Sequence, residues 1–508
     1  MGNETASYPM QGPIEISRNG MYRLSSILQI VSLCLTLLAI VLYLNIGGND
    51  YVNGNTILLT CFLSMQNIGM LAHQKKTNDP FILILALVTT LFYLTRVSSL
   101  IVVPFSMVLS RFSLTVDDFN YSILYICIAN TAMFLGLRAA RGKNVIKKIG
   151  AENPKPTKFL AVILIVIFGL LSQYIYKIDI DLINRISGLF FGLFLYHPAI
   201  LLLTLVYFII NLEIMGRRRK VVFCLLFSAL VILTTLNGSR SIFLALTIYT
   251  VCILLSLNGV IELRKRHFIL GIIVSPLLAL SFLMATFLRD DGYDAKTTVT
   301  SDRVSMLKDF SLTGEQNRAA DEVQFIGAAL LFDRAGFLSY AAEVITNHDQ
   351  YSAVVNFEYY LKSIVDNLLT PGFDIFEIPR ASNAVNRIYT GQALPTKEEA
   401  ATNYNSEMFT IYGESYIMFG GYLALIPLFV ISFIFKRIYF LISTRNIFLY
   451  HLYRSLILLT FYSWLNSFGF DWMAGEIGKF LITIFILKEF YKTRAKRRAG
   501  NNLYVTVS

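Results

Sequence analysis

The feature that most constrains this chain is a series of apolar runs, each about 20 residues long, the length at which a helix crosses a bilayer. Lipid offers the backbone no hydrogen-bonding partner, so only helices and closed barrels span a membrane. Of the 508 residues, 55% are hydrophobic and only 15% are charged, which is too few charges for a soluble protein of this size. The sequence therefore predicts an all-α polytopic integral membrane protein.

The positions of these runs predict about 12 transmembrane helices. The sixth run contains His197-Pro198, which favours a kink there. The predicted spans are 24–45, 55–72, 81–103, 120–137, 159–175, 187–212, 221–237, 241–258, 268–288, 411–435, 446–466 and 474–490.

Positive charge divides unevenly between the two sides of these spans. With the N-terminus placed in the cytoplasm, the inward segments carry most lysines and arginines of the connecting loops. The short outward loops hold only Arg111, Lys177, Arg185 and Arg240. Cytoplasmic loops of membrane proteins are enriched in Lys and Arg, so we predict that both termini are cytoplasmic. The net charge of +11 then reflects orientation in the membrane and not nucleic-acid binding.

One outward segment, residues 289–410, is much longer than the others and carries more acidic than basic residues. Its stretches QFIGAALLFDRAGFLSYAAEVI and FEYYLKSIVDNLL have the spacing of amphipathic helices that lie on the membrane or cap the bundle. The predicted organisation has four parts: an N-terminal membrane bundle (1–288), an extracytoplasmic loop subdomain (289–410), C-terminal membrane helices (411–490) and a basic cytoplasmic tail (491–508).

Arginines on the predicted outer side are candidate ligands for an anion. Arg240 follows Gly238 and Ser239 at the start of a span, where a guanidinium and backbone N–H groups suit a phosphate or pyrophosphate. Arg380 and Arg387 are seven residues apart, so on a helix they share one face and could clamp one ligand. Capping, headgroup contacts and ordinary salt bridges are the structural alternatives.

Glu414, in the stretch FTIYGESYIMFGGY, is the candidate general base. It lies at the predicted outer entry of a span, where burial raises a carboxyl pKa towards neutrality. The structural alternative is a helix-N-terminal carboxylate stabilised by the helix dipole. His348 is another possible base, and Arg96 and Arg454 are ionisable residues within spans. No nucleotide-binding loop, hydrolase triad or metal-ligand pattern is found, so we predict neither a metal nor a cofactor.

Two segments resemble bacterial polysaccharide polymerases of the Wzy type, the O-antigen and exopolysaccharide repeat-unit polymerases. NGSRSIFLAL, residues 237–246, ends one span and opens the next, and is similar to their Gly-Ser-Arg signature. GESYIMFGGYLALIPLFVISFIF, residues 413–435, is similar to the glycine-rich segment that opens a late span after their large outer loop. The overall plan, many spans with one large late outer loop, also matches.

The resemblance implies a GT-C-like glycosyltransferase architecture and a polymerisation reaction. Such an enzyme joins undecaprenyl-pyrophosphate-linked oligosaccharide repeat units at the outer face of the cytoplasmic (inner) membrane, and transfers the growing chain to the non-reducing end of the incoming unit. The implied partners are the lipid-linked donor and acceptor, the bilayer, and a chain-length regulator and a flippase of the same pathway, with no nucleic acid. The implied roles are Glu414 as catalytic base, and pyrophosphate or glycan binding by Arg240, Arg303, Arg334, Arg380 and Arg387.

Two other readings stay open. The first is an O-antigen-ligase-like enzyme or a polyprenyl-phosphate-sugar glycosyltransferase; the latter usually has paired acids in an outer loop, and Asp117 and Asp118 form such a pair. The second is a lipid-linked oligosaccharide flippase or transporter, a class that tends to carry internal repeats, broken helices and midplane charges. We find no repeat and few central charges, so the sequence favours the polymerase.

Overall fold

The computed structural model of the chain is helical apart from two short strands and the turns and loops within the described ranges. Five described helices are long and apolar enough to cross a membrane: Leu24–Ile46, Gly54–Thr77, Pro80–Ile101, Val116–Ala139 and Gly421–Leu441. The predicted spans 159–175 and 268–288, and nearly all of 474–490, lie outside the described residues. The structure describes residues 21–102, 113–140, 197–211, 215–236, 241–264, 337–368, 375–389, 391, 393–394, 410–442, 447–466, 470, 473 and 477–478.

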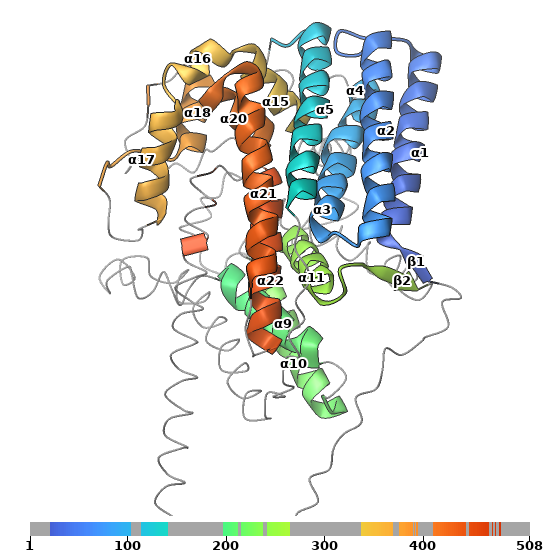
Figure 1. The fold of residues 1–508 in the computed structure, drawn as a ribbon, viewed down its shortest axis with the longest axis vertical. Helices are drawn as coiled ribbons and strands as arrows, with labels where there is room; N and C mark the ends of the chain where they lie inside the picture. The colour runs from blue at the N-terminus through green and yellow to red at the C-terminus, as the bar shows by residue number, and fades with distance from the viewer. Residues whose placement is uncertain are drawn as a thin grey trace, which may run out of the picture.

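Four long helices pack side by side in a row, and a fifth, interrupted helix lies behind them (Figure 1). The interrupted helix is mostly buried, whereas the outer helices of the row are mostly exposed. The row consists of α1 (Leu24–Ile46), α2 (Gly54–Thr77), α5 (Val116–Ala139) and α21 (Leu425–Leu441). The interrupted helix consists of α3 (Pro80–Val88), the π-helix η1 (Thr89–Leu94) and α4 (Thr95–Val102).

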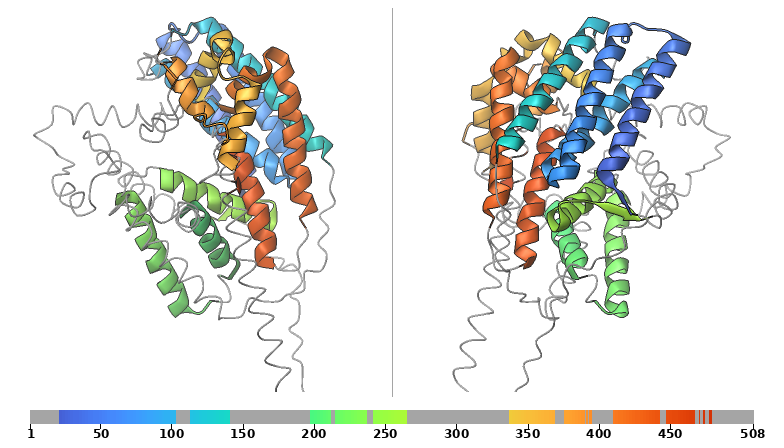
Figure 2. Two further views of the ribbon diagram at one scale, coloured as in Figure 1. Left: turned by 90° about the vertical axis from the view of Figure 1, so that its left-hand side faces the viewer. Right: turned by 45° about the vertical axis from the view of Figure 1, so that its right-hand side comes forward.

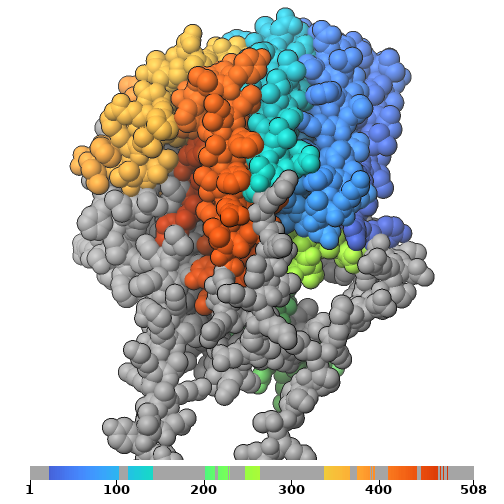
Figure 3. All heavy atoms as spheres, in the orientation of Figure 1, coloured from blue at the N-terminus to red at the C-terminus, as the bar shows by residue number. Residues whose placement is uncertain are grey.

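Large apolar side chains are exposed along the row of helices, which appears on one face of the molecule in Figure 3. Soluble monomers rarely expose apolar surface of this extent, and a lipid-facing surface is the arrangement that tolerates it. The exposed residues include Ile30, Leu33, Leu37, Leu38, Val41 and Leu44 of α1, Leu58, Phe62 and Met65 of α2, Leu124 and Leu135 of α5, and Ile426, Val430, Ile434, Ile438 and Leu441 of α21.

A buried polar cluster joins three of these helices inside the apolar core. The Asn67 amide of α2 donates to Ser32 Oγ of α1 at 3.0 Å and to Thr90 Oγ1 of η1 at 2.8 Å. The two hydroxyl groups lie 3.1 Å apart. Small hydroxyl and amide side chains of this kind hold membrane helices together, because in an apolar surrounding each must find a partner within the protein.

A two-stranded antiparallel sheet closes one end of the bundle (Figure 1). Strand β1 (Met21–Arg23) pairs with β2 (Glu262–Arg264), which fastens the segment before α1 to the segment after α11. Strands of three residues are too short to give a periodic pattern, so the all-α prediction missed them. Arg23 Nη1 also donates to the Lys75 carbonyl at 3.3 Å, so segments predicted to share one side of the membrane meet at one end.

The remaining described helices form two groups (Figures 1 and 2). Near the sheet, α9 (His197–Asn211), α10 (Arg217–Leu236), α11 (Ser241–Asn258) and α22 (Ile447–Leu465) are linked by packing contacts. Near the start of α5, the long outer segment forms helices within both predicted apolar stretches. The two helices within these stretches are α15 (Phe337–Thr346) and α17 (Phe357–Leu368). The same segment also forms α16 (His348–Ser352) and α18 (Ala381–Tyr389), and α20 (Thr410–Phe419) follows.

The predicted span 411–435 is two separate helices in the structure. Gly420 and Gly421 have φ angles of +69° and +44°, which end α20 and begin the short 3₁₀-helix η3 (Gly421–Ala424) ahead of α21. Backbone in this left-handed region is unfavourable for residues with a Cβ and easy for glycine. The helix long enough to cross a membrane therefore starts at Gly421, and the preceding α20 is a distinct, largely buried element.

The backbones of α5 and α21 approach closely where the two helices cross. A Cβ added at Gly136 would overlap the backbone carbonyl of Phe429, so only glycine fits at this crossing. Two turns further along α21, Lys436 Nζ lies 2.5 Å from Asp79 Oδ2 and donates to the Leu137 carbonyl at 2.6 Å. The other oxygen of Asp79 accepts from the Phe81 N–H at 3.0 Å and caps α3. This ion pair therefore ties α21 to both α3 and α5.

We expect Gly136→Ala to lower the free energy of unfolding by about 1–3 kcal/mol, since the extra methyl forces α5 and α21 apart. Thermal unfolding of the protein in detergent micelles measures the change. Gly69→Ala in α2 is the matched control: nothing lies within 4 Å of its added Cβ, and the better helix propensity of alanine contributes about 0.5–1 kcal/mol. Equal destabilisation by both variants would rule out a tight crossing at Gly136.

We expect Lys436→Met to cost about 3–5 kcal/mol, because it leaves the buried Asp79 carboxylate without its partner. Asp79→Asn keeps the oxygen that caps α3 while removing the charge. The double variant Lys436→Met/Asp79→Asn should lose much less stability than the sum of the losses of the two single variants. A double-mutant cycle measured by chemical denaturation would reveal this. Additive losses would mean that the two residues do not stabilise each other.

Candidate functional site between the outer helices and the membrane bundle

Polar residues, most of them buried, gather where α15 and α20 pack against the membrane bundle. We call this region the loop–bundle interface. It joins elements far apart in the sequence, since its members come from α4, α5, α15 and α20. Its residues are Arg96, Asp118, Ser339, Glu343, Thr346, Tyr412 and Glu414.

Arg96 is the central residue of the loop–bundle interface. It belongs to the candidate span Pro80–Ile101, and only 1% of its surface is exposed. Its Nε and Nη2 atoms each lie 3.3 Å from Ser339 Oγ of α15. A guanidinium stays charged at every physiological pH, and a buried charge is costly unless it is paired. A chain retains such a residue within a membrane helix chiefly where function requires it.

The π-helix η1 ends two residues before Arg96 and changes the direction in which the Arg96 side chain points. The Thr95 N–H bonds to the Thr90 carbonyl five residues earlier, so the turn holds one more residue than an α-helical turn. The Thr95 hydroxyl donates to the same carbonyl at 3.1 Å. This insertion puts both Tyr93 and Arg96 on the buried side, each 1% exposed. Single π-turns inside α-helices are frequent at functional sites.

Asp118 connects the start of α5 to the end of α15. Its Oδ2 accepts from both the N–H and the hydroxyl of Thr115 at 2.7 Å, which satisfies the first turn of α5. Its Oδ1 accepts from the Thr346 hydroxyl at 3.1 Å. Both carboxylate oxygens are therefore engaged, one in capping α5 and the other in holding α15 to it, while the neighbouring Asp117 is exposed.

Glu343 is a buried carboxyl group on the side of α15 that faces α16. Its Oε1 accepts from the Asn347 amide at 2.8 Å and from the Tyr351 hydroxyl at 3.0 Å. Burial raises the pKa of Glu343 above its ordinary value of 4.5, the two hydrogen bonds lower it, and the nearby charge of Asp118 raises it. The net direction of the pKa shift is upward.

The predicted base Glu414 lies on α20 and is 5% exposed. Its Oε2 accepts from the Phe470 N–H at 3.1 Å, which links α20 to the chain beyond α22. Two residues earlier, Tyr412 donates to Asn130 Oδ1 of α5 at 2.6 Å, and its ring packs edge-on against Tyr93 at 5.3 Å. Glu414 is thus held among rigid elements, and its catalytic role stays a prediction.

The predicted arginine pair lies on a third element, α18. Arg387 is in its last turn, whereas Arg380 immediately precedes its first residue, and both side chains are half-buried. The Arg380 carbonyl accepts from the N–H groups of Asn383 and Ala384, which starts the helix. The buried Asp366 carboxylate of α17 accepts backbone N–H groups of residues 375, 376 and 378 and so fixes the turn that leads to Arg380.

Three other predicted ligands, Arg240, Arg303 and Arg334, lie outside the described residues. Arg454, which the sequence also placed within a predicted span, stacks on aromatic rings: its guanidinium carbon lies 3.9 Å from the centre of the Tyr439 ring and 4.9 Å from that of Tyr450. These cation–π contacts stabilise the buried guanidinium of Arg454, so its burial does not require a functional role.

Sequence reasoning named Arg96 only as an ionisable residue and did not name Ser339, Glu343 or Thr346. The π-turn and the pairing of α4 with α15 have no signature in the sequence. The polar residues in the otherwise apolar stretch 324–345 were the one signal available, since α15 buries Ser339 and Glu343.

Comparisons with protein-family models, with curated proteins and with solved structures find no match to this chain. The functional argument therefore depends on the geometry of the site.

The raised pKa of Glu343 makes stability depend on pH. Between the ordinary glutamate value and the raised one, the folded protein binds more protons than the unfolded chain, so the free energy of unfolding falls as pH rises through that window. Glu343→Gln keeps an oxygen for Asn347 and Tyr351 but does not titrate. We expect the variant to lose less thermal stability than the wild type when pH is raised from about 4 to 7.

Glu358→Gln is the control for this measurement. Glu358 is exposed and pairs with Lys362 at 2.6 Å, which lowers its pKa, so its loss cannot produce the same pH profile. Identical pH profiles for the wild type and Glu343→Gln would show that Glu343 does not titrate differently in the folded protein.

Proposed function

We propose that this chain is a polysaccharide polymerase of about 12 spans with a GT-C-like architecture in the bacterial inner membrane. It joins undecaprenyl-pyrophosphate-linked oligosaccharide repeat units on the extracytoplasmic face and adds the growing chain to the non-reducing end of the incoming unit. Both termini are cytoplasmic in this proposal.

The observation that carries the proposal is the contact of Arg96 with Ser339. A permanently charged guanidinium is buried near one end of a membrane helix, and a helix of the long outer segment covers it. A lipid-anchored donor confines the reaction to the membrane surface, and its pyrophosphate leaving group needs cations that stabilise developing negative charge. Arg96 supplies such a cation at that depth, and we add it to the predicted ligands Arg240, Arg380 and Arg387.

The distribution of contacts supports the sidedness in this proposal. Arg23, Lys75 and Lys436, all predicted to face the cytoplasm, make their contacts at the end of the bundle near the sheet. The contact of Asp118 with Thr346, both predicted to face outward, lies at the end where α5 begins. The residues predicted to face the cytoplasm therefore make their contacts at one end of the bundle, and those predicted to face outward make theirs at the other end.

The paired-acid alternative is less well supported. A polyprenyl-phosphate-sugar transferase that used Asp117 and Asp118 would need both carboxylates available to its substrate. Asp118 already accepts three hydrogen bonds, from Thr115 and Thr346. A ligase-like enzyme would use the same outer arginines. The glycan of the deletion strain distinguishes it, because that strain would contain full-length polymer still attached to its lipid carrier.

The test is the glycan profile of a strain lacking this gene, complemented with variants. We expect Arg96→Gln to lower long-chain polymer about a hundredfold or more and to leave lipid-linked single repeats in the membrane, while Arg96→Lys restores part of the ladder. Arg240→Ala tests the predicted pyrophosphate ligand in the same way.

Arg138→Ala is the matched control, because Arg138 is an exposed arginine near the cytoplasmic end of α5. Membrane levels of each variant must match the wild type. A full ladder from Arg96→Gln would remove Arg96 from the mechanism, and unpolymerised repeats confined to the cytoplasmic face of the deletion strain would identify a flippase instead.

A further inference from the structure

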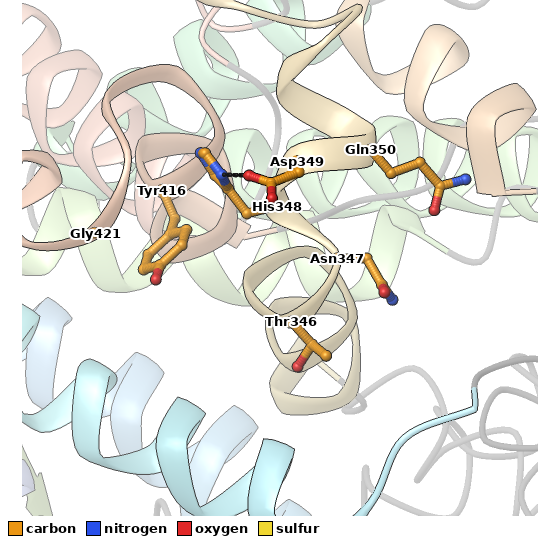
Figure 4. A pocket seen from close by; sticks show the side chains of 7 residues that line it. All are labelled: Thr346, Asn347, His348, Asp349, Gln350, Tyr416 and Gly421. Carbon is orange, nitrogen blue, oxygen red and sulfur yellow. Dashed lines mark hydrogen bonds and ion pairs between the residues drawn. The ribbon is translucent and has the colours of Figure 1, made fainter.

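A polar pocket of about 480 Å³ opens beside the loop–bundle interface (Figure 4). The end of α15 and the start of α16 form one wall, and α20 and η3 contribute the other. Among the residues that the structure describes, no lysine or arginine lines it. The lining residues are Thr346, Asn347, His348, Asp349, Gln350, Tyr416 and Gly421.

Tyr416 is held in place by three neighbours. Its ring packs edge-on against His348 at 5.3 Å and against Tyr125 at 5.0 Å, measured between ring centres. Its hydroxyl oxygen lies 3.1 Å from that of Tyr121. His348 is itself oriented by Asp349, whose Oδ1 lies 3.2 Å from His348 Nδ1 (Figure 4). The pocket therefore presents a preset aromatic ring next to fixed polar groups.

The polar groups of the pocket include both donors and acceptors. Gln350 is exposed and brings an amide with two donor hydrogens and an acceptor oxygen. His348 Nε2 is buried and has no hydrogen-bond partner among the described residues. The rest of the His348 side chain is partly exposed, so a bound ligand can contact the ring.

This set of groups suits a sugar and not an anion. Sugar hydroxyls donate and accept hydrogen bonds at once, and an aromatic ring covers the apolar face of a pyranose. The carboxylate of Asp349 repels a phosphate, and no lysine or arginine among the described lining residues offsets that repulsion. An apolar ligand would leave the many polar groups without partners, which is costly.

We propose that this pocket binds a neutral sugar residue of the acceptor oligosaccharide. The assignment rests on the proposed function. In it, the arginines bind the negatively charged pyrophosphate of the donor, and the pocket binds a neutral sugar of the acceptor. Thr346 belongs to both regions, since it lines the pocket and donates to Asp118 of the loop–bundle interface. A sugar bound here therefore lies at the edge of the predicted reaction site.

Saturation-transfer NMR on the purified full-length protein in detergent tests the pocket directly. The probe is the oligosaccharide repeat released by mild acid from the lipid-linked pool of the deletion strain, with inorganic pyrophosphate as competitor. We expect a neutral sugar of the probe to receive the strongest saturation, and pyrophosphate to leave that signal unchanged. Gln350→Trp should weaken binding at least about tenfold, since its ring fills the pocket.

Two controls keep the result interpretable. Glu358→Gln changes an exposed residue of α17 that does not line the pocket, and its binding should equal that of the wild type. Gln350 is exposed, so a thermal unfolding curve like that of the wild type will show that Gln350→Trp folds. Saturation of an acidic sugar, or displacement by pyrophosphate, would overturn the assignment.

The same variants separate failure of the pocket from failure of the proposed function. If polymer formation requires the gene but Gln350→Trp binds the probe as the wild type does, the pocket assignment is wrong and the polymerase stands. If the deletion strain still makes polymer while Gln350→Trp loses binding, the polymerase is wrong and the sugar pocket stands.

Discussion

The crossing of α5 and α21 is the contact on which the rest of the described structure depends. Gly136 lets the two backbones approach until Phe429 lies directly against it, and the Lys436–Asp79 ion pair locks the same crossing from the side. These residues are almost 300 positions apart, as Lys436 and Leu137 show with a separation of 299. Because α21 is fixed here, the helix before it, α20, is carried to the opposite end of the bundle, where it meets α5 and α15.

The loop–bundle interface follows from that placement. Tyr412 of α20 bonds to Asn130 of α5, and Asp118 of α5 bonds to Thr346 of α15. Between these contacts, Arg96 is turned inward by the π-helix and covered by Ser339. A buried guanidinium is stable only in a closely fitted surrounding, so the surrounding helices must be positioned before such a residue can be tolerated. The site is therefore a product of packing between the outer segment and the membrane bundle.

Charge separates the two proposed binding regions at this end of the protein. Arg96 and the half-buried Arg380 and Arg387 provide cations, whereas no lysine or arginine is among the described residues that line the pocket at His348 and Tyr416. A reaction between two lipid-linked substrates needs this division, because donor and acceptor must be held in different ways at once. Orientation of both substrates accounts for much of the rate that such a site can achieve.

The sequence alone predicted an all-α membrane protein. Four of its predicted spans, 24–45, 55–72, 81–103 and 120–137, coincide with described helices long and apolar enough to cross a membrane, because a run of about 20 apolar residues has one stable structure in lipid. It also predicted helices α15 and α17 from their amphipathic spacing. Tertiary structure decided the remainder. The break at Gly420–Gly421, the π-turn before Arg96 and the pairing of Ser339 with Arg96 have no periodic signal, since each depends on a partner distant in sequence. Local pattern fixes which segments enter the membrane, whereas the choice of partner among those segments is made by close packing and by buried polar groups that must pair.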